Sequence, residues 1–157
     1  MSFLSSRLSQ FTKATKLFST RNFRKTDLAK EFHDACDGKT NTLVIIKSGQ
    51  YIAGGYTEVA WSSPAWTHVR AENAFLFSVN RQKVYGIVVL KHAMGVGQNY
   101  AAEFGETGEG LGVRPNVAEG GTSDLYGYDL DGVEDQKTEL MGSRKFKVDE
   151  YEVYKLE

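Results

Sequence analysis

The spacing of apolar side chains near the start of the chain predicts a helix. Between residues 27 and 37 they recur at intervals of four and three, with charged side chains on the other side. Thr26 suits the N-cap, with Asp27 in the first turn, and Gly38 suits a C-terminal stop. We therefore expect one well-formed helix before the main body of the domain.

After that helix the apolar pattern changes to a period of two, which is typical of strands. Two adjacent glycines, Gly54 and Gly55, interrupt one such run and indicate a bulge, or close approach by another backbone or ring. The alternation near the C-terminus slips once around Asp149, which indicates a second bulge. Strands are predicted at 16–18, 42–47, 51–57, 74–79, 83–90 and 146–156, with short ones near 111–113 and 125–126.

The order of these elements predicts a mainly β fold of the α+β class. Strands follow one another without alternating helices, so a parallel sheet is disfavoured, and we expect a two-sheet antiparallel β-sandwich with one or two flanking helices. The stretches 61–72 and 95–135 are expected to be loops, the second with short strands. A length of 157 residues suits one domain, here 16–157, preceded by a segment at 1–15.

Charge is distributed very unevenly along the chain. Residues 1–26 carry six Lys or Arg and no Asp or Glu, which leaves 13 basic against 20 acidic residues in the remainder. The segment 1–15 also places apolar side chains along one side of a possible helix, a pattern typical of mitochondrial targeting peptides. The alternative is a leading helix that packs on its own domain or on a partner. We expect a mitochondrial location, with a cytoplasmic one as the alternative.

Candidate chemistry is sparse. The glycines of 105–112 lack the Gly-Lys-Ser/Thr of a phosphate loop, and the acidic stretch 124–135 holds only a fragment of a calcium loop. His33 and Cys36 form a lone pair, and the other two histidines, His68 and His92, lie far away in sequence, so the zinc signal is weak. We predict no metal, no cofactor and no catalytic residue.

Cys36 is the only cysteine, so no intramolecular disulfide can form. Its position at the end of an apolar helix face favours a small buried hydrophobe over a redox thiol. No run of apolar residues is long enough to span a bilayer, and the acidic body disfavours nucleic acid. These observations favour protein binding over catalysis.

The motifs, taken in order, resemble those of the TLDc domain family, the domain of oxidation-resistance proteins. The resemblance covers roughly 16–156, and the Asp-Gly that the family has before its helix is replaced by Arg21-Asn22. It is carried by Lys16-Leu17-Phe18, Phe32 to Lys39, Thr42 to Lys47, Gly54 to Thr57 with Trp61-Ser62-Ser63, Asn73 to Ser78, Phe104-Gly105, and Leu140 to Tyr154. The signature positions that we interpret as structural are Gly54, Gly55, Tyr56, Trp61, Phe75, Phe77 and Gly105.

The resemblance implies a β-sandwich, protection against oxidative stress and, in several members, binding to the vacuolar ATPase; it supplies no catalytic residue. We therefore expect a non-catalytic interaction module, an accessory subunit or regulator of a mitochondrial respiratory or ATP-synthase assembly. The alternative is a soluble oxidation-resistance factor that binds a vacuolar-type ATPase. Contacts with protein partners are expected through the acidic loop 124–135 and through five basic residues: Arg7, Lys13, Arg21, Arg24 and Lys25.

Overall fold

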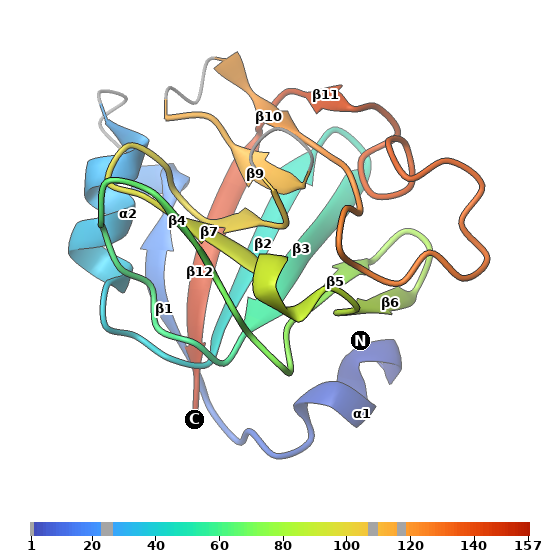
Figure 1. Cartoon of the computed structure of the whole chain (residues 1–157), viewed down its shortest axis with the longest axis horizontal. Coiled ribbons are helices and arrows are strands. Elements are labelled where there is room, and N and C mark those ends of the chain that lie inside the picture. The colour runs from blue at the N-terminus through green and yellow to red at the C-terminus, as the bar shows by residue number, and fades with distance from the viewer. Residues whose placement is uncertain (1, 23–26, 107–109, 116–118) are drawn as a thin grey trace.

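Two antiparallel sheets of six strands each form a sandwich in the computed structural model, which describes residues 2–22, 27–106, 110–115 and 119–157 (Figure 1). This confirms the predicted fold class. The first sheet runs β1 (Ala14–Ser19), β12 (Glu150–Leu156), β2 (Thr42–Ser48), β3 (Tyr51–Thr57), β5 (Phe75–Ser78) and β6 (Lys83–Gly86). The second runs β11 (Lys145–Phe146), β10 (Gly121–Thr122), β9 (Leu111–Val113), β8 (Glu103–Phe104), β7 (Met94–Val96) and β4 (Thr67–Val69).

The hairpin of β2 and β3 is confirmed, but the bulge expected at its two glycines is wrong. Pairing is continuous on both sides of β3, from β2 and from β5. The other expectation, close approach by a ring, is confirmed. A Cβ on Gly55 would lie 2.8 Å from the ring of Phe104, and a Cβ on Gly54 would lie 2.8 Å from the ring of Phe77. The two glycines therefore let aromatic rings approach both faces of β3 closely.

The single strand predicted over 146–156 is two strands in different sheets. β11 pairs with β10 in the second sheet, and β12 pairs with β1 and β2 in the first. The slip of alternation near Asp149 is therefore a crossing between the sheets and not a bulge. Asp149 holds the crossing in place, because its carboxylate accepts a hydrogen bond from Gly49 N at 2.6 Å and its own N–H donates to Lys47 O.

Three further boundaries differ from the prediction. β6 ends at Gly86, and the residues after it form an isolated bridge, Ile87 to Tyr128, and a 3₁₀ helix, Leu90–His92. The expected loop 61–72 contains β4, and the strand expected near 125–126 is absent, with β10 slightly earlier. Strands of three residues or fewer are too short for a period-two pattern to be recognised. The ends of the other strands depend on a partner strand that is distant in sequence, which local periodicity does not record.

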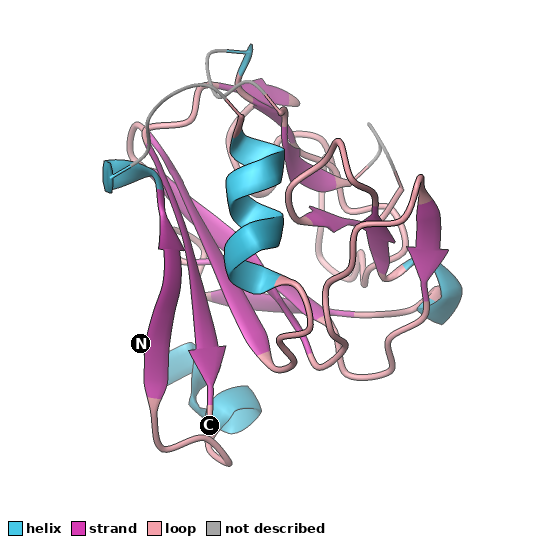
Figure 2. Ribbon diagram, turned by 90° about the vertical axis from the view of Figure 1, so that its left-hand side faces the viewer, coloured by secondary structure: helices cyan, strands magenta, loops and turns pink. Residues whose placement is uncertain are grey.

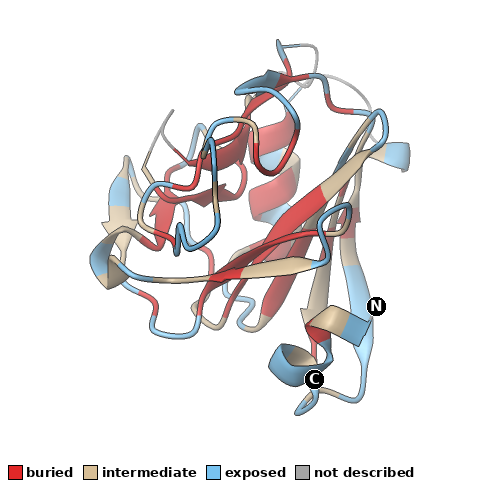
Figure 3. Ribbon diagram, turned by 90° about the vertical axis from the view of Figure 1, so that its right-hand side faces the viewer, coloured by how far each residue is buried: buried red, intermediate tan, exposed pale blue. Residues whose placement is uncertain are grey.

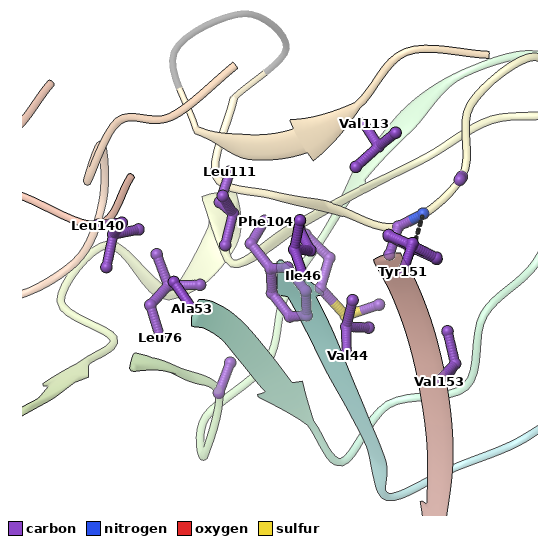
Figure 4. Packing of buried hydrophobic residues seen from close by; sticks show 14 of the residues in the cluster. Val44, Ile46, Ala53, Leu76, Phe104, Leu111, Val113, Leu140, Tyr151 and Val153 are labelled. Atoms are coloured by element: carbon purple, nitrogen blue, oxygen red, sulfur yellow. Dashed lines mark hydrogen bonds between the residues drawn. The ribbon is translucent and has the colours of Figure 1, made fainter. Parts of the chain in front are cut away.

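The main core lies between the sheets (Figures 3 and 4). Phe104 and Leu111 of the second sheet pack toward Val44 and Leu76 of the first. The Tyr151 hydroxyl accepts a hydrogen bond from Ala102 N at 3.2 Å, which satisfies its polar end inside the core. Interlocked side chains of this kind fix the spacing of the two sheets.

The helix α2 (Leu28–Cys36) stands between the two sheets at one side of the sandwich (Figure 2). Its N-cap is Asp27, whose side chain accepts from Lys30 N, and not Thr26, which lies outside the described residues. Gly38, at a φ of +76°, ends the segment as expected. Phe32 is fully buried and packs edge-on against Trp61.

The N-terminal segment packs on its own domain, and the mitochondrial targeting expected of it stays a prediction. A 3₁₀ helix (Ser2–Leu4) leads into α1 (Ser5–Leu8), which lies beside β5 and β6 (Figure 1). Leu4 is buried, and the apolar side chains of this segment cover the outer face of the first sheet, where they meet Leu43, Tyr56, Phe75, Phe77 and Leu156. β1 then begins at Ala14. In the part of the chain that the structure describes, no helix is long and apolar enough to cross a membrane.

Candidate functional site

The outer face of the second sheet carries an unusual transverse row. Strand register places one residue from every strand side by side across this face: His68, Gly95, Glu103, Gly112, Thr122 and Lys145. The neighbours of these residues along the strands, such as Met94 and Phe104, point into the core. Two glycines in the row leave space that larger side chains from adjacent positions occupy.

Glu103 uses one of these spaces. Its carboxyl lies over Gly112, where a Cβ would collide with it, and the residue is only 3% exposed. Oε2 has no hydrogen-bond partner among the described residues. Burial raises the pKa of this carboxyl to about 8, although Arg114 partly opposes the effect. Glu103 is therefore mainly protonated at neutral pH.

Trp66 uses the other space. Its ring lies over Gly95, where a Cβ would collide with it. From Trp66 a continuous series of ring contacts crosses the face, with centroids 4.7 to 5.9 Å apart. We call this series the aromatic ladder; its members in order are Tyr100, Trp66, His68, His92 and Tyr126.

Two histidines and a glutamate meet at the middle of the aromatic ladder. The rings of His68 and His92 stack with centroids 4.7 Å apart and an interplanar angle of 12°. Each ring faces a different oxygen of Glu106: His68 Nε2 lies 3.7 Å from Oε1, and His92 Nδ1 lies 3.7 Å from Oε2. The three side chains come from β4, from the 3₁₀ helix Leu90–His92 and from the segment that follows β8. This is the only group in the described chain with the composition and spacing of a metal site.

His33, in contrast, has a structural environment. Its Nδ1 lies 2.6 Å from Asp37 Oδ1, and its Nε2 lies 2.9 Å from Gly97 O and 2.8 Å from Tyr100 O. Asp37 also accepts a hydrogen bond from Ser63 Oγ at 2.6 Å. These contacts tie α2 to the loop after β7.

Exposed apolar side chains gather where two segments run side by side. Val88, Tyr126 and Leu130 are the large hydrophobic residues most exposed in the described chain, at 64%, 38% and 47%. Hydrogen bonds from Val88 N to Gly127 O at 2.8 Å and from Asp129 N to Gly86 O at 2.9 Å join their segments. We call this surface, formed by residues 86–92 and 125–135, the docking edge.

The docking edge is also acidic. Asp129, Asp131, Glu134 and Asp135 are exposed, and none forms an ion pair with another described residue. A surface hollow of about 440 Å³ is lined by Leu130 and Val133 together with Glu134 and Asp135. The carboxylates of 124–135 do not converge as calcium ligands would, since no group of three among them lies within bonding reach of one ion.

Three of the five predicted basic contact residues lie in the described part of the chain, and one of them, Arg7, reaches Gly86 at the start of the docking edge. Arg7, on the N-terminal segment, lies over the ring of Phe75, with its guanidinium carbon 5.9 Å from the ring centroid. Lys13 lies 3.9 Å from the Glu157 carboxylate, and Arg21 forms a close ion pair with Glu150 at 2.5 Å. The remaining two predicted residues, Arg24 and Lys25, lie outside the described residues.

The signature positions are buried or tightly packed. Trp61, Phe75 and Phe77 are at most 1% exposed, and the Trp61 Nε1–H donates to Thr42 Oγ1 at 2.8 Å. Tyr56 stacks on Phe75 on the outer face of the first sheet. Gly105 has a φ of +88°, which favours glycine.

Cys36, the last residue of α2, is fully buried in the core. Burial raises the pKa of its thiol to about 12, so the reactive thiolate is scarce at neutral pH. The thiol therefore has the environment of a packed core residue and not that of an exposed redox centre.

The family model of the TLDc domain matches residues 1–157, the whole chain. Among the curated proteins, a sequence search finds no match.

Proposed function

Because the chain belongs to the TLDc domain family, we propose that it acts as a non-catalytic protein-binding module, an accessory subunit or regulator of a larger assembly. The observation that carries this proposal is the docking edge, where three exposed large apolar residues lie beside four carboxylates that form no ion pair within the described part of the chain. Exposed apolar side chains rimmed by charge are typical of surfaces that bind proteins.

The chemistry of the docking edge suits a partner segment with complementary charge and apolar side chains. Leu130 and Val133 offer apolar contacts in the hollow, and the carboxylates of Glu134 and Asp135 outnumber its one cation, Lys137. A segment that inserts an apolar side chain between lysines or arginines complements both properties. Such charges steer the encounter, and the apolar contact contributes most of the affinity.

A mitochondrial respiratory or ATP-synthase assembly is the proposed host. Support comes from the first 26 residues, which are basic and contain no acid. We further propose that this segment is retained in the mature protein, because its removal would expose Tyr56, Phe75 and Phe77 to water. The alternative host, a vacuolar-type ATPase, is distinguished by which membranes co-purify with the protein.

The test is the native mass of the tagged chain in extracts of its source cells. The wild type is expected in a large assembly, and Leu130→Arg is expected to release it, because the added cation and the lost apolar contact both oppose docking. Thr40→Arg adds the same charge at an exposed position near α2 and serves as the matched control. Equal native masses for wild type and both variants would contradict docking through this edge.

A further inference from the structure

Three side chains with metal-binding groups converge on the outer face of the second sheet from three separate segments. One ligand atom from each of His68, His92 and Glu106 lies within 4.8 Å of the other two. We propose that these residues form a binding site for a divalent transition metal, with zinc as the best-suited ion. This inference does not depend on the proposed protein-binding function.

The spacing of the donor atoms fits a metal better than direct hydrogen bonds. Each histidine nitrogen lies 3.7 Å from its oxygen of Glu106, which is too long for a hydrogen bond. A tetrahedral zinc site with bonds of about 2.0–2.1 Å separates neighbouring ligand atoms by roughly 3.4 Å. The nitrogen-to-oxygen spacing is therefore already close to that of a loaded site.

Hydrogen bonding within the fold does not account for the two histidines. Nδ1 of both His68 and His92 is buried without a hydrogen-bond partner among the described residues. A buried polar group without a partner is costly, and the third histidine of the chain, His33, has partners on both nitrogens. A metal ion supplies the missing partner for His92 Nδ1, the atom that faces Glu106.

Loading requires a small rearrangement. The stacked rings are nearly parallel, so their lone pairs do not converge, and they must tilt until the nitrogens approach by up to about 1.5 Å. Both segments allow this movement, because β4 is an edge strand of three residues and His92 lies in a 3₁₀ turn.

The donor set selects the class of ion. Two imidazoles and one carboxylate suit zinc and its transition-metal neighbours, whereas calcium and magnesium prefer oxygen ligands alone. Three protein ligands leave a fourth position for water or for a side chain of a partner protein.

Isothermal titration of the metal-free protein with zinc tests the proposal, with cobalt, calcium and magnesium as comparison ions. We expect one equivalent of zinc or cobalt to bind, and no measurable binding of calcium or magnesium. His68→Gln, His92→Gln and Glu106→Gln are each expected to weaken zinc binding on the order of 100-fold. Asp131→Asn is the control for non-specific binding to the acidic docking edge and should leave the zinc affinity unchanged.

X-ray absorption of the zinc-loaded wild type gives a readout that does not depend on how the variants fold. Two imidazole ligands per zinc would support the site, and one or none would overturn it. The proposal also fails if zinc does not bind, or if the histidine variants, shown by circular dichroism to be folded, bind zinc as tightly as the wild type.

Discussion

Substitution of Glu103 by glutamine tests the electrostatics of the buried row directly. The carboxyl is almost fully buried over Gly112, and burial raises its pKa from an ordinary 4.5 to about 8. Between these two values the unfolded chain releases the proton while the folded chain keeps it. The free energy of unfolding must therefore fall as the pH rises through this window.

The size of the effect follows from the pKa difference. One pKa unit corresponds to about 1.4 kcal/mol, so Glu103 lowers the free energy of unfolding by about 2.5 kcal/mol between pH 5 and pH 7. The loss reaches at most about 5 kcal/mol above pH 8. Glutamine has nearly the same shape and does not titrate, so Glu103→Gln is expected to remove this part of the pH dependence.

Urea unfolding of both proteins at half-unit steps from pH 5 to pH 8 provides the measurement. The expected result is that the variant gains stability relative to the wild type steadily as the pH rises. Glu139→Ala is a useful comparison, because Glu139 accepts a hydrogen bond from the Tyr85 hydroxyl at 2.7 Å and the loss of this acceptor should lower stability at every pH. Parallel profiles for wild type and Glu103→Gln would refute the reasoning.

Two further substitutions and one deletion test other contacts of the fold. Gly55→Ala should cost about 1–3 kcal/mol in urea unfolding, because the new methyl meets the Phe104 ring at 2.8 Å, and an unchanged midpoint would contradict the close approach. Deletion of residues 2–12 should lower the free energy of unfolding by about 3 kcal/mol or more and make the protein bind a hydrophobic dye. Unchanged stability without dye binding would contradict the packing of this segment. Arg21→Ala should leave the urea midpoint unchanged, because its ion pair with Glu150 is solvent-exposed; a large shift would show that this pair matters to the fold.

Local signals were sufficient to predict the helix and the β2–β3 hairpin. The turn at Gly49 has a φ of +56°, and the stop at Gly38 has a φ of +76°, so both glycines mark their element ends in the sequence itself. The same kind of signal was ambiguous at Asp149. The pattern of apolar and polar residues shows that side chains change face at Asp149, but it does not show that the chain passes from one sheet to the other.

The candidate site depended on pairing that local patterns do not contain. β4 is too short for its periodicity to be recognised, so His68 was assigned to a loop, and its neighbour His92 was expected beyond the end of a long strand. Glu103 lies in a strand of two residues and resembles any acidic loop residue in the sequence. The docking edge was partly predictable, since its acidic loop is continuous, but the exposure of Val88 was not.

The native mass of the protein in its source cells tests the central claim most directly. The chain alone has a mass of 17.5 kDa. The account predicts that the wild type elutes in an assembly many times larger and that Leu130→Arg shifts to the position of the free chain. A wild type that elutes as a 17.5 kDa monomer in a fresh, undiluted extract would contradict the claim that it works as a subunit or bound regulator.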